Sequence, residues 1–166
     1  VTDTQPVFEQ YCRKALELVG YQGSGKVLDV ACGPGTLSLL IHRDAGEIHG
    51  IDFSPGMLEC FNREVARRGI ANIKTWRMDG QNLEFGDGEF DWVFSMFGLM
   101  FFPDRGKGFR EIVRTLKPGG RAAITAWAPR MRLRRISTPS LYIRKMPVMF
   151  SRKSLSSTRF LLAYMV

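Results

Sequence analysis

Cysteine is scarce in this chain. Only three cysteines occur among its 166 residues, at Cys12, Cys32 and Cys60, and none of them forms a C-x-x-C pair. Three thiols cannot all pair within one chain, which favours buried free thiols in a reducing compartment over a disulfide-stabilised secreted fold. No signal-peptide pattern is visible at the start of the sequence. We therefore expect a cytoplasmic protein.

Long apolar runs are also missing. The nearest is the segment 94–102, which Ser95 and Gly98 interrupt, and it falls short of the roughly 18 residues that a membrane span requires. We expect no membrane span. A chain of 166 residues that is 45% hydrophobic is long enough for one compact α/β domain and too short for two.

Acidic residues are absent from the end of the chain. Of the 24 basic residues, nine lie between Arg130 and Val166, and none of the 16 acidic residues does, so the first 129 residues are close to neutral. Nucleic-acid binding by the folded part therefore has no electrostatic support. We assign residues 1–129 to one domain and residues 130–166 to a basic, Ser/Arg-rich tail. Three explanations of this tail stay open: an altered reading frame, splice form or truncation; a disordered tail; or a membrane or nucleic-acid module.

The most informative stretch that is present runs from Val27 to Thr36, V-L-D-V-A-C-G-P-G-T. Apolar residues lead into this loop as a buried parallel strand requires, and they resume at helical spacing after it. Gly33 and Gly35 remove the Cβ atoms that would keep a ligand away from the backbone, and the following helix start offers amide donors. The next strand ends in Asp52, whose carboxylate can accept both ribose hydroxyls of an adenosine. The pattern predicts a nucleotide-binding βαβ unit.

Two further acids distinguish between adenosine cofactors. The loop fits the dinucleotide fingerprint only loosely, and Asp29 stands just before it, where a negative charge repels a pyrophosphate but suits an amine. Asp79 follows a third predicted strand, where it can accept from the adenine amino group, and Gly80 then presents an amide to the ring. Both acids argue against a nicotinamide cofactor, so an NAD-dependent oxidoreductase is the weaker alternative.

At these motifs the chain resembles the class I S-adenosylmethionine-dependent methyltransferases, particularly the small-molecule group that includes the quinone-biosynthesis enzymes. The resemblance covers most of residues 7–129 and rests on five motifs in order: 27–36, 50–58, 77–80, 90–97 and 116–121. It implies a binding site for S-adenosylmethionine made of Asp29, Ala31, Cys32, Gly33, Gly35, Asp52, Phe53, Met57, Asp79, Gly80, Ser95, Met96 and Phe97.

The resemblance also divides these residues by the part of the cofactor that they hold. Asp29 and the backbone of 31–35 are implied to hold the methionine part, with 95–97 beside it. Asp52 is implied to hold the ribose, and the remaining side chains, Phe53, Met57 and Asp79, the adenine. Ala31 stands where the family usually has the first glycine of the loop, a small change that leaves room for the ligand.

Five strands alternating with helices predict an α/β fold with a doubly wound, Rossmann-like parallel sheet. We expect strands near 26–30, 48–52, 72–78, 90–95 and 121–127, and helices near 7–19, 35–42, 54–68 and 105–116. The first helix is expected to cover the sheet edge or the cofactor mouth. Family members continue with a helix and an antiparallel strand pair, which the sequence after Pro129 does not resemble. We therefore expect a C-terminally truncated or altered sheet. If the closing strands are absent, the segment 122–127 is an exposed edge strand prone to self-association, unless the tail covers it.

The implied reaction is methyl transfer to a small-molecule acceptor by in-line displacement. No motif identifies a catalytic residue or a metal ligand; Tyr11, His42 and His49 are candidates for a general base, although His49 reads better as a packed core residue. The apolar segment 97–102 favours a small apolar acceptor, and core packing explains this segment equally well. The alternative function is an inactive or binding-only remnant, because the missing strands often help to build the acceptor pocket.

Overall fold

The computed structural model describes residues 5–127, 141–144 and 159–165. In chain order the elements are α1 (Gln5–Val19), β1 (Lys26–Val30), α2 (Thr36–Ile41), β2 (Glu47–Asp52), α3 (Pro55–Arg68), β3 (Ile73–Arg77), β4 (Phe90–Met96), the short 3-10 helix η1 (Leu99–Phe101), α4 (Arg105–Thr115), β5 (Leu116–Trp127), β6 (Leu141–Arg144) and β7 (Arg159–Met165). None of the helices in these ranges combines the length and the apolar character that a membrane crossing needs.

The strands form one sheet in the order β3-β2-β1-β4-β5-β7-β6. Strands β1 to β5 all run parallel to their neighbours. The chain moves outward from β1 to β3, then returns to the other side of β1 to add β4 and β5. Because the order reverses between β1 and β4, the loops after these two strands separate and leave a crevice at their carboxyl ends. The predicted doubly wound sheet is confirmed.

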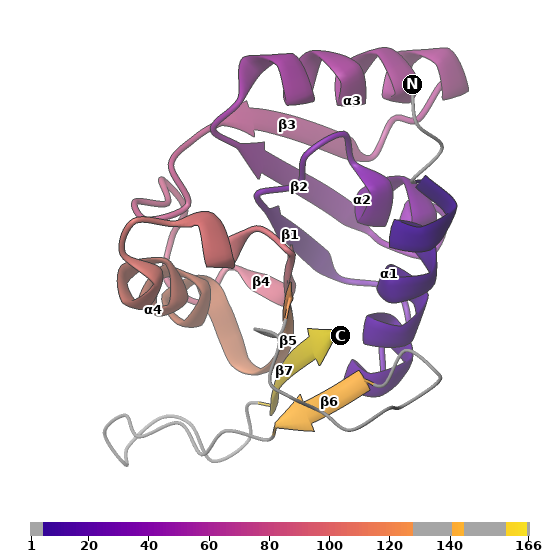
Figure 1. Ribbon diagram of the computed structural model, residues 1–166. Helices are drawn as coiled ribbons and strands as arrows, with labels where there is room; N and C mark the ends of the chain where they lie inside the picture. Colours follow the sequence, from indigo (N-terminus) through magenta and orange to yellow (C-terminus); the bar gives the residue numbers. More distant parts are fainter. Residues whose placement is uncertain (1–4, 128–140, 145–158, 166) are drawn as a thin grey trace.

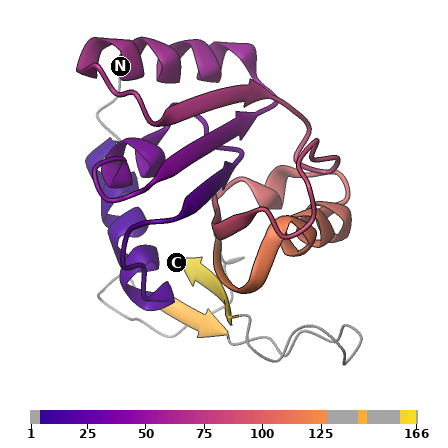
Figure 2. The ribbon, with the colours of Figure 1, turned by 180° about the vertical axis from the view of Figure 1, so that it is seen from behind.

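Helices cover both faces of this sheet, as Figures 1 and 2 show. On one face, buried residues of α1, α2 and α3 pack against Val27, Ile48 and Phe94 of three adjacent strands. On the other face, Leu28 and Ile51 belong to a second cluster that includes Ile112 of α4. Neighbouring residues of one strand, such as Val27 and Leu28, enter opposite clusters because strand side chains alternate between the faces.

Local sequence signals explain where α3 begins and ends. The Ser54 hydroxyl accepts a hydrogen bond from the amide of Met57, Pro55 occupies the first helical position, and Gly69 ends the helix with a φ of 63°. A serine cap, a proline whose missing N–H is not needed there, and a left-handed glycine are typical of these positions. The predicted bounds of α3 are confirmed, and those of the other helices and of β1 to β4 agree within two residues.

The sheet differs from the sequence prediction beyond β5. We expected no closing strands, yet β7 pairs parallel with β5 along residues 121–127, and β6 pairs antiparallel with β7. The fifth strand is therefore an interior strand, and the prediction that it forms an exposed edge is wrong; self-association of the chain stays a prediction. Arginine, lysine and serine interrupt the apolar residues of the tail up to residue 159, and the continuous apolar run that follows, 160–165, was not interpreted as a strand. The expectation of a disordered tail concerns mostly residues outside the described ranges.

Candidate functional site

A pocket of about 780 Å³ lies at the carboxyl ends of the central strands, at the position where the strand order reverses. Ligands of open α/β sheets bind in this crevice. The pocket is lined by Phe8, Ala31, Gly33, Pro34, Ile51, Asp52, Phe53, Ser54, Met57, Met78, Asp79, Gly80, Gln81, Met96, Phe97, Gly98, Met100, Phe101, Phe102, Pro103 and Trp127.

The glycine loop between β1 and α2 forms one wall of this pocket. Gly35 has a φ of +84°, and a Cβ atom there would lie 2.2 Å from the ring of Phe61, so packing beneath the loop requires a glycine. Gly33 also has a positive φ, but a Cβ atom there would meet nothing within 4 Å. The backbone at Gly33 therefore faces open space on the pocket side, where a ligand can approach it.

Asp52 connects the glycine loop to the end of β2. One carboxylate oxygen accepts a hydrogen bond from the amide of Gly33 and the other accepts one from the amide of Ser54, both at 2.8 Å. A carboxylate has about four lone-pair sites on its two oxygens, so both oxygens keep acceptor capacity toward the pocket. The side chain thus holds the loop in shape and still presents negative charge to a ligand.

Asp29 lies beneath the loop rather than in the pocket wall. It is 1% exposed, and its carboxylate accepts a hydrogen bond of 2.7 Å from the hydroxyl of Ser38 in α2. Burial raises the pKa of this carboxyl to about 6, against the lowering effect of the Ser38 hydrogen bonds. Three more of the predicted residues, Cys32, Gly35 and Ser95, are buried and stay outside the pocket lining as well.

The polar end of the pocket lies over the ends of β2 and β3. Phe53 is 73% exposed and Met57, in the first turn of α3, is 46% exposed. The guanidinium of Arg77 lies 6.0 Å from the centre of the Phe53 ring. Across from them, Asp79 and Gly80 also line the pocket. Exposed apolar side chains beside a carboxylate form a surface that suits a flat heterocycle with donor groups.

Aromatic side chains form the opposite end of the pocket. The rings of Phe97 and Trp127 are stacked with centres 4.5 Å apart, and Phe8 of α1 meets the Phe97 ring edge-on at 5.6 Å. Phe97 has a φ of +60°, which is uncommon for a residue with a large side chain. Its amide donates to the buried hydroxyl of Thr125 at 2.9 Å. This hydrogen bond holds the turn after β4 in the strained conformation.

Nine of the 13 predicted site residues line this single pocket: Ala31, Gly33, Asp52, Phe53, Met57, Asp79, Gly80, Met96 and Phe97. Their roles toward a ligand stay predictions. Sequence reasoning did not assign Phe8, Gln81 and Trp127 to the site. A signal for Phe8 existed, since we expected the first helix to cover the cofactor mouth, whereas nothing local distinguishes the other two.

The three candidates for a general base lie outside the pocket lining. Tyr11 packs edge-on against Phe97 and Trp127, behind the aromatic end. His49 is 5% exposed and stands three residues before Asp52 on β2, about 10 Å away along the strand, where it packs against Phe85, Phe90 and Trp76. His42 follows α2. Within the described ranges, no group of three His, Cys, Asp or Glu residues has the arrangement of a metal site.

Comparison with known proteins agrees with this geometry. The family model described as "Methyltransferase domain" matches residues 27–120. A demethylmenaquinone methyltransferase of Thermus thermophilus is 35% identical over 119 residues, which are 70% of this chain and 54% of that protein. The ubiquinone/menaquinone biosynthesis C-methyltransferase UbiE of Geobacter sulfurreducens is 35% identical over 147 residues, 86% of this chain and 57% of that protein. The chain thus spans about half the length of these curated relatives.

Solved structures share the fold. A candidate S-adenosyl-L-methionine-dependent methyltransferase from Methanococcus maripaludis superposes with a TM-score of 0.68 at 27% identity, over 75% of this chain and 57% of that one. The [4+2]-cyclase SpnF superposes with a TM-score of 0.63 at 29% identity, over 68% of this chain and 42% of that one. Because the second neighbour is named for a cyclisation, the fold alone does not determine the reaction.

Proposed function

The chain belongs to the class I S-adenosylmethionine-dependent methyltransferases, with S-adenosylmethionine as the cofactor, and we propose that it transfers the methyl group to a small, apolar, quinone-like acceptor. One observation carries this proposal: a single pocket has a polar end at the glycine loop and an aromatic end at Phe97 and Trp127. The names of the curated relatives support an acceptor of the quinone type.

The residues at the polar end fit the cofactor. Gly33 leaves its backbone open to a ligand, which suits the methionine part. Asp52 keeps free acceptor capacity for the ribose hydroxyls, and each such charge-assisted hydrogen bond contributes about 1.5 to 3 kcal/mol. Phe53 and Met57 offer apolar surface to the faces of the adenine, and Asp79 an acceptor to its amino group. The buried Asp29 accepts a hydrogen bond from Ser38 at the base of the loop, and its contact with the methionine part stays a prediction.

The aromatic end fits a planar acceptor. Phe97, Trp127 and Phe8 offer ring faces and edges, and aromatic pairs contribute about 0.5 to 1.5 kcal/mol beyond the area that they bury. When bound, S-adenosylmethionine supplies a methyl group on a positively charged sulfur. The task of these side chains is to align the acceptor with that group and to exclude water. Alignment of this kind can supply about 7 to 11 kcal/mol of a reaction barrier.

The pocket offers little help with proton removal. Among the described residues that line it, the titratable side chains are Asp52 and Asp79, both at the polar end. An acceptor that ionises by itself therefore suits the site, and a hydroquinone has phenolic hydroxyls, whose ordinary pKa is near 10. On this mechanism the rate of transfer increases with pH as the acceptor ionises.

Two measurements test the proposal in sequence. Titration calorimetry with S-adenosylmethionine, S-adenosylhomocysteine and NAD is expected to show binding of the first two only. Incubation with S-adenosylmethionine and chemically reduced 1,4-naphthoquinone is then expected to yield a methylated product by mass spectrometry. Binding without methylation of this or any other quinol would leave a cofactor-binding remnant. Failure of a folded sample to bind either sulfur ligand would refute the cofactor assignment.

A further inference from the structure

Asp79 belongs to a loop whose shape is set from outside the pocket. The loop joins β3 to β4, spans residues 78–89, and contains glycines at Gly80, Gly86 and Gly88. The Asp79 carboxylate accepts hydrogen bonds from the amide of Gln81 at 2.9 Å and from its side chain at 3.1 Å. The side-chain oxygen of Gln81 in turn accepts from the amide of Asp104, at the start of α4, at 2.8 Å.

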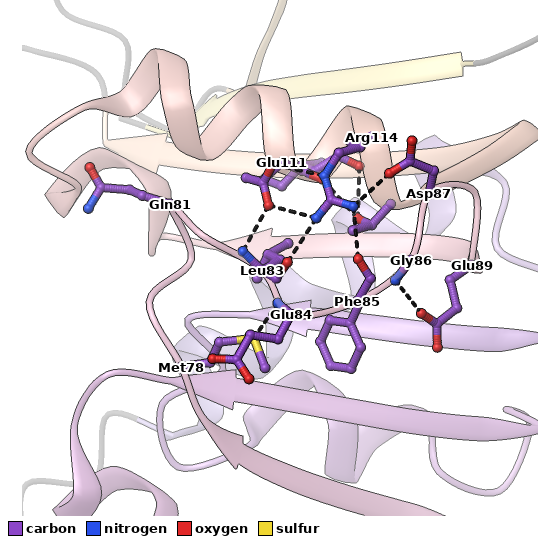
Figure 3. Close-up of polar contacts among 12 residues, drawn as sticks. Met78, Gln81, Leu83, Glu84, Phe85, Gly86, Asp87, Glu89, Glu111 and Arg114 are labelled. Atoms are coloured by element: carbon purple, nitrogen blue, oxygen red, sulfur yellow. Dashed lines mark hydrogen bonds and ion pairs between the residues drawn. The ribbon is translucent and has the colours of Figure 1, made fainter.

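Arg114 of α4 holds the following part of this loop, as Figure 3 shows. Its terminal nitrogens donate to the carbonyl oxygens of Leu83 at 2.9 Å and Phe85 at 2.8 Å, and to the carboxylate of Asp87 at 2.7 Å. Glu111, one helical turn earlier, accepts two hydrogen bonds from the same guanidinium and a third from the amide of Leu83 at 2.8 Å. Figure 3 shows these groups converging from the helix and the loop onto one guanidinium.

This arrangement is more than a surface ion pair. Arg114 is 30% exposed and Glu111 is 18% exposed, so both are partly shielded from water. The hydrogen bonds to Glu111 and Asp87 raise the pKa of Arg114 and keep it charged, and the same bond lowers the pKa of Glu111. A planar guanidinium with five N–H donors can satisfy a carboxylate and two carbonyls together, which a lysine ammonium cannot do in the same geometry.

We propose that Arg114 and Glu111, together called the clamp, are positioning residues for purine recognition. They fix the loop that presents Asp79 to the adenine end of the pocket. The proposal rests on the proposed function, in which Asp79 accepts a hydrogen bond from the adenine amino group. Neither residue lines the pocket; they act through the backbone of 83–85. Loss of the clamp frees the backbone of 83–85, so that the Asp79–Gln81 pair is tied to α4 only through the amide of Asp104.

The test is the ratio of two affinities measured on the same protein sample. S-adenosylhomocysteine carries the amino group, whereas S-inosylhomocysteine carries an oxo group that cannot donate to Asp79. For the unaltered chain we expect the inosyl ligand to bind about 10-fold to 100-fold more weakly, as the loss of one hydrogen bond to a charged group implies. Since a partly unfolded sample weakens both apparent affinities equally, the ratio responds to purine recognition and not to general stability.

The variant Arg114→Lys keeps the positive charge and loses the planar fork. In this variant we expect the ratio of the affinities for the adenosyl and inosyl ligands to fall to within about threefold of one, because only the adenosyl ligand loses affinity. Arg67→Lys is the matched control: Arg67 forms a similar ion pair with Glu64, three residues earlier on α3, at 2.7 Å, and it lies outside the pocket lining, so the ratio of this variant is expected to stay that of the unaltered chain. Should Arg114→Lys fail to fold, Glu111→Gln tests the same clamp from the other side and is expected to lower the ratio as well.

The outcomes separate this proposal from the proposed function. If the unaltered chain discriminates and both clamp variants keep the full ratio, the positioning role is refuted while the cofactor site stands. If the unaltered chain binds both ligands equally, Asp79 does not recognise the purine and the proposal fails at its premise. If a folded sample binds neither, the cofactor assignment itself is wrong.

Discussion

Asp52→Asn is the most direct perturbation of the cofactor site. The carboxylate of Asp52 accepts from the amides of Gly33 and Ser54 and is proposed to accept from the two ribose hydroxyls. An amide side chain keeps one acceptor oxygen and replaces the other by a donor. We expect it to lose one charge-assisted hydrogen bond and weaken another, about 2 to 4 kcal/mol together, which corresponds to a 30-fold to 1,000-fold weaker affinity for S-adenosylhomocysteine.

Calorimetry with a second ligand separates ribose recognition from damage to the loop. The 2′-deoxy analogue of S-adenosylhomocysteine lacks one hydroxyl, so it is expected to bind the unaltered chain at least about 10-fold more weakly than the parent ligand. In Asp52→Asn the same deletion is expected to cost much less, because the partner of the hydroxyl is gone. Asp44→Asn, an exposed acid outside the pocket, is the control. Equal losses from the deletion in both proteins would refute the ribose assignment.

Three further perturbations test the framework around the pocket. Burial raises the Asp29 pKa from 3.8 to about 6, so ionisation destabilises the folded state. Relative to Asp29→Asn, which stays neutral, the chain is expected to lose up to about 3 kcal/mol of unfolding free energy as pH rises from about 3 to about 7, through the folded pKa. Urea titrations at each pH measure this loss, and a constant difference between the two proteins would contradict it. Gly80→Ala places a Cβ atom 2.4 Å from the Phe102 ring and is expected to lower stability by about 1 to 3 kcal/mol and to weaken binding of S-adenosylhomocysteine; unchanged urea midpoints and affinity would argue against that contact. Thr125→Val removes the acceptor for the Phe97 amide, with an expected loss of about 1 to 3 kcal/mol that Thr125→Ser restores; equal losses in both variants would point to packing instead of the hydroxyl.

The polar half of the pocket was predictable because short sequence segments encode it. The glycine loop follows a buried strand directly, and Asp52 and Asp79 each follow the end of their own strand. Parallel strands bring their carboxyl ends to one edge of the sheet, so a residue's position in its motif almost determines its position in space. Asp29 is the exception. Its place before the loop did not reveal its burial: strand alternation points its side chain into the protein, where it meets Ser38, while its predicted contact with the cofactor stays a prediction.

The last strands were missed for a different physical reason. Strand β6 lies in a segment rich in basic residues, and β7 is an apolar run without polar alternation, so neither shows the alternating pattern that identifies a strand from sequence. Their position is determined by the edge of β5, whose backbone groups pair with the parallel strand β7 over seven residues. Pairing of this kind depends on the rest of the sheet and not on the propensity of the added segment.

The aromatic half of the pocket is encoded neither in one short segment nor by the pairing of one added strand. On the proposed function, this affects how an acceptor is selected. Phe8, Phe97 and Trp127 come from α1, the turn after β4 and the end of β5, and they meet only after the sheet has formed. No short sequence motif predicts such a contact. The strain at Phe97 is held by Thr125 on the neighbouring strand, so the position of this ring depends on the register between β4 and β5. Substitutions in α1 or at the end of β5 can therefore alter the aromatic end while the polar end, where Asp52 holds the glycine loop, stays unchanged. On the proposed function, this separate encoding of the two ends allows one cofactor site to serve different acceptors.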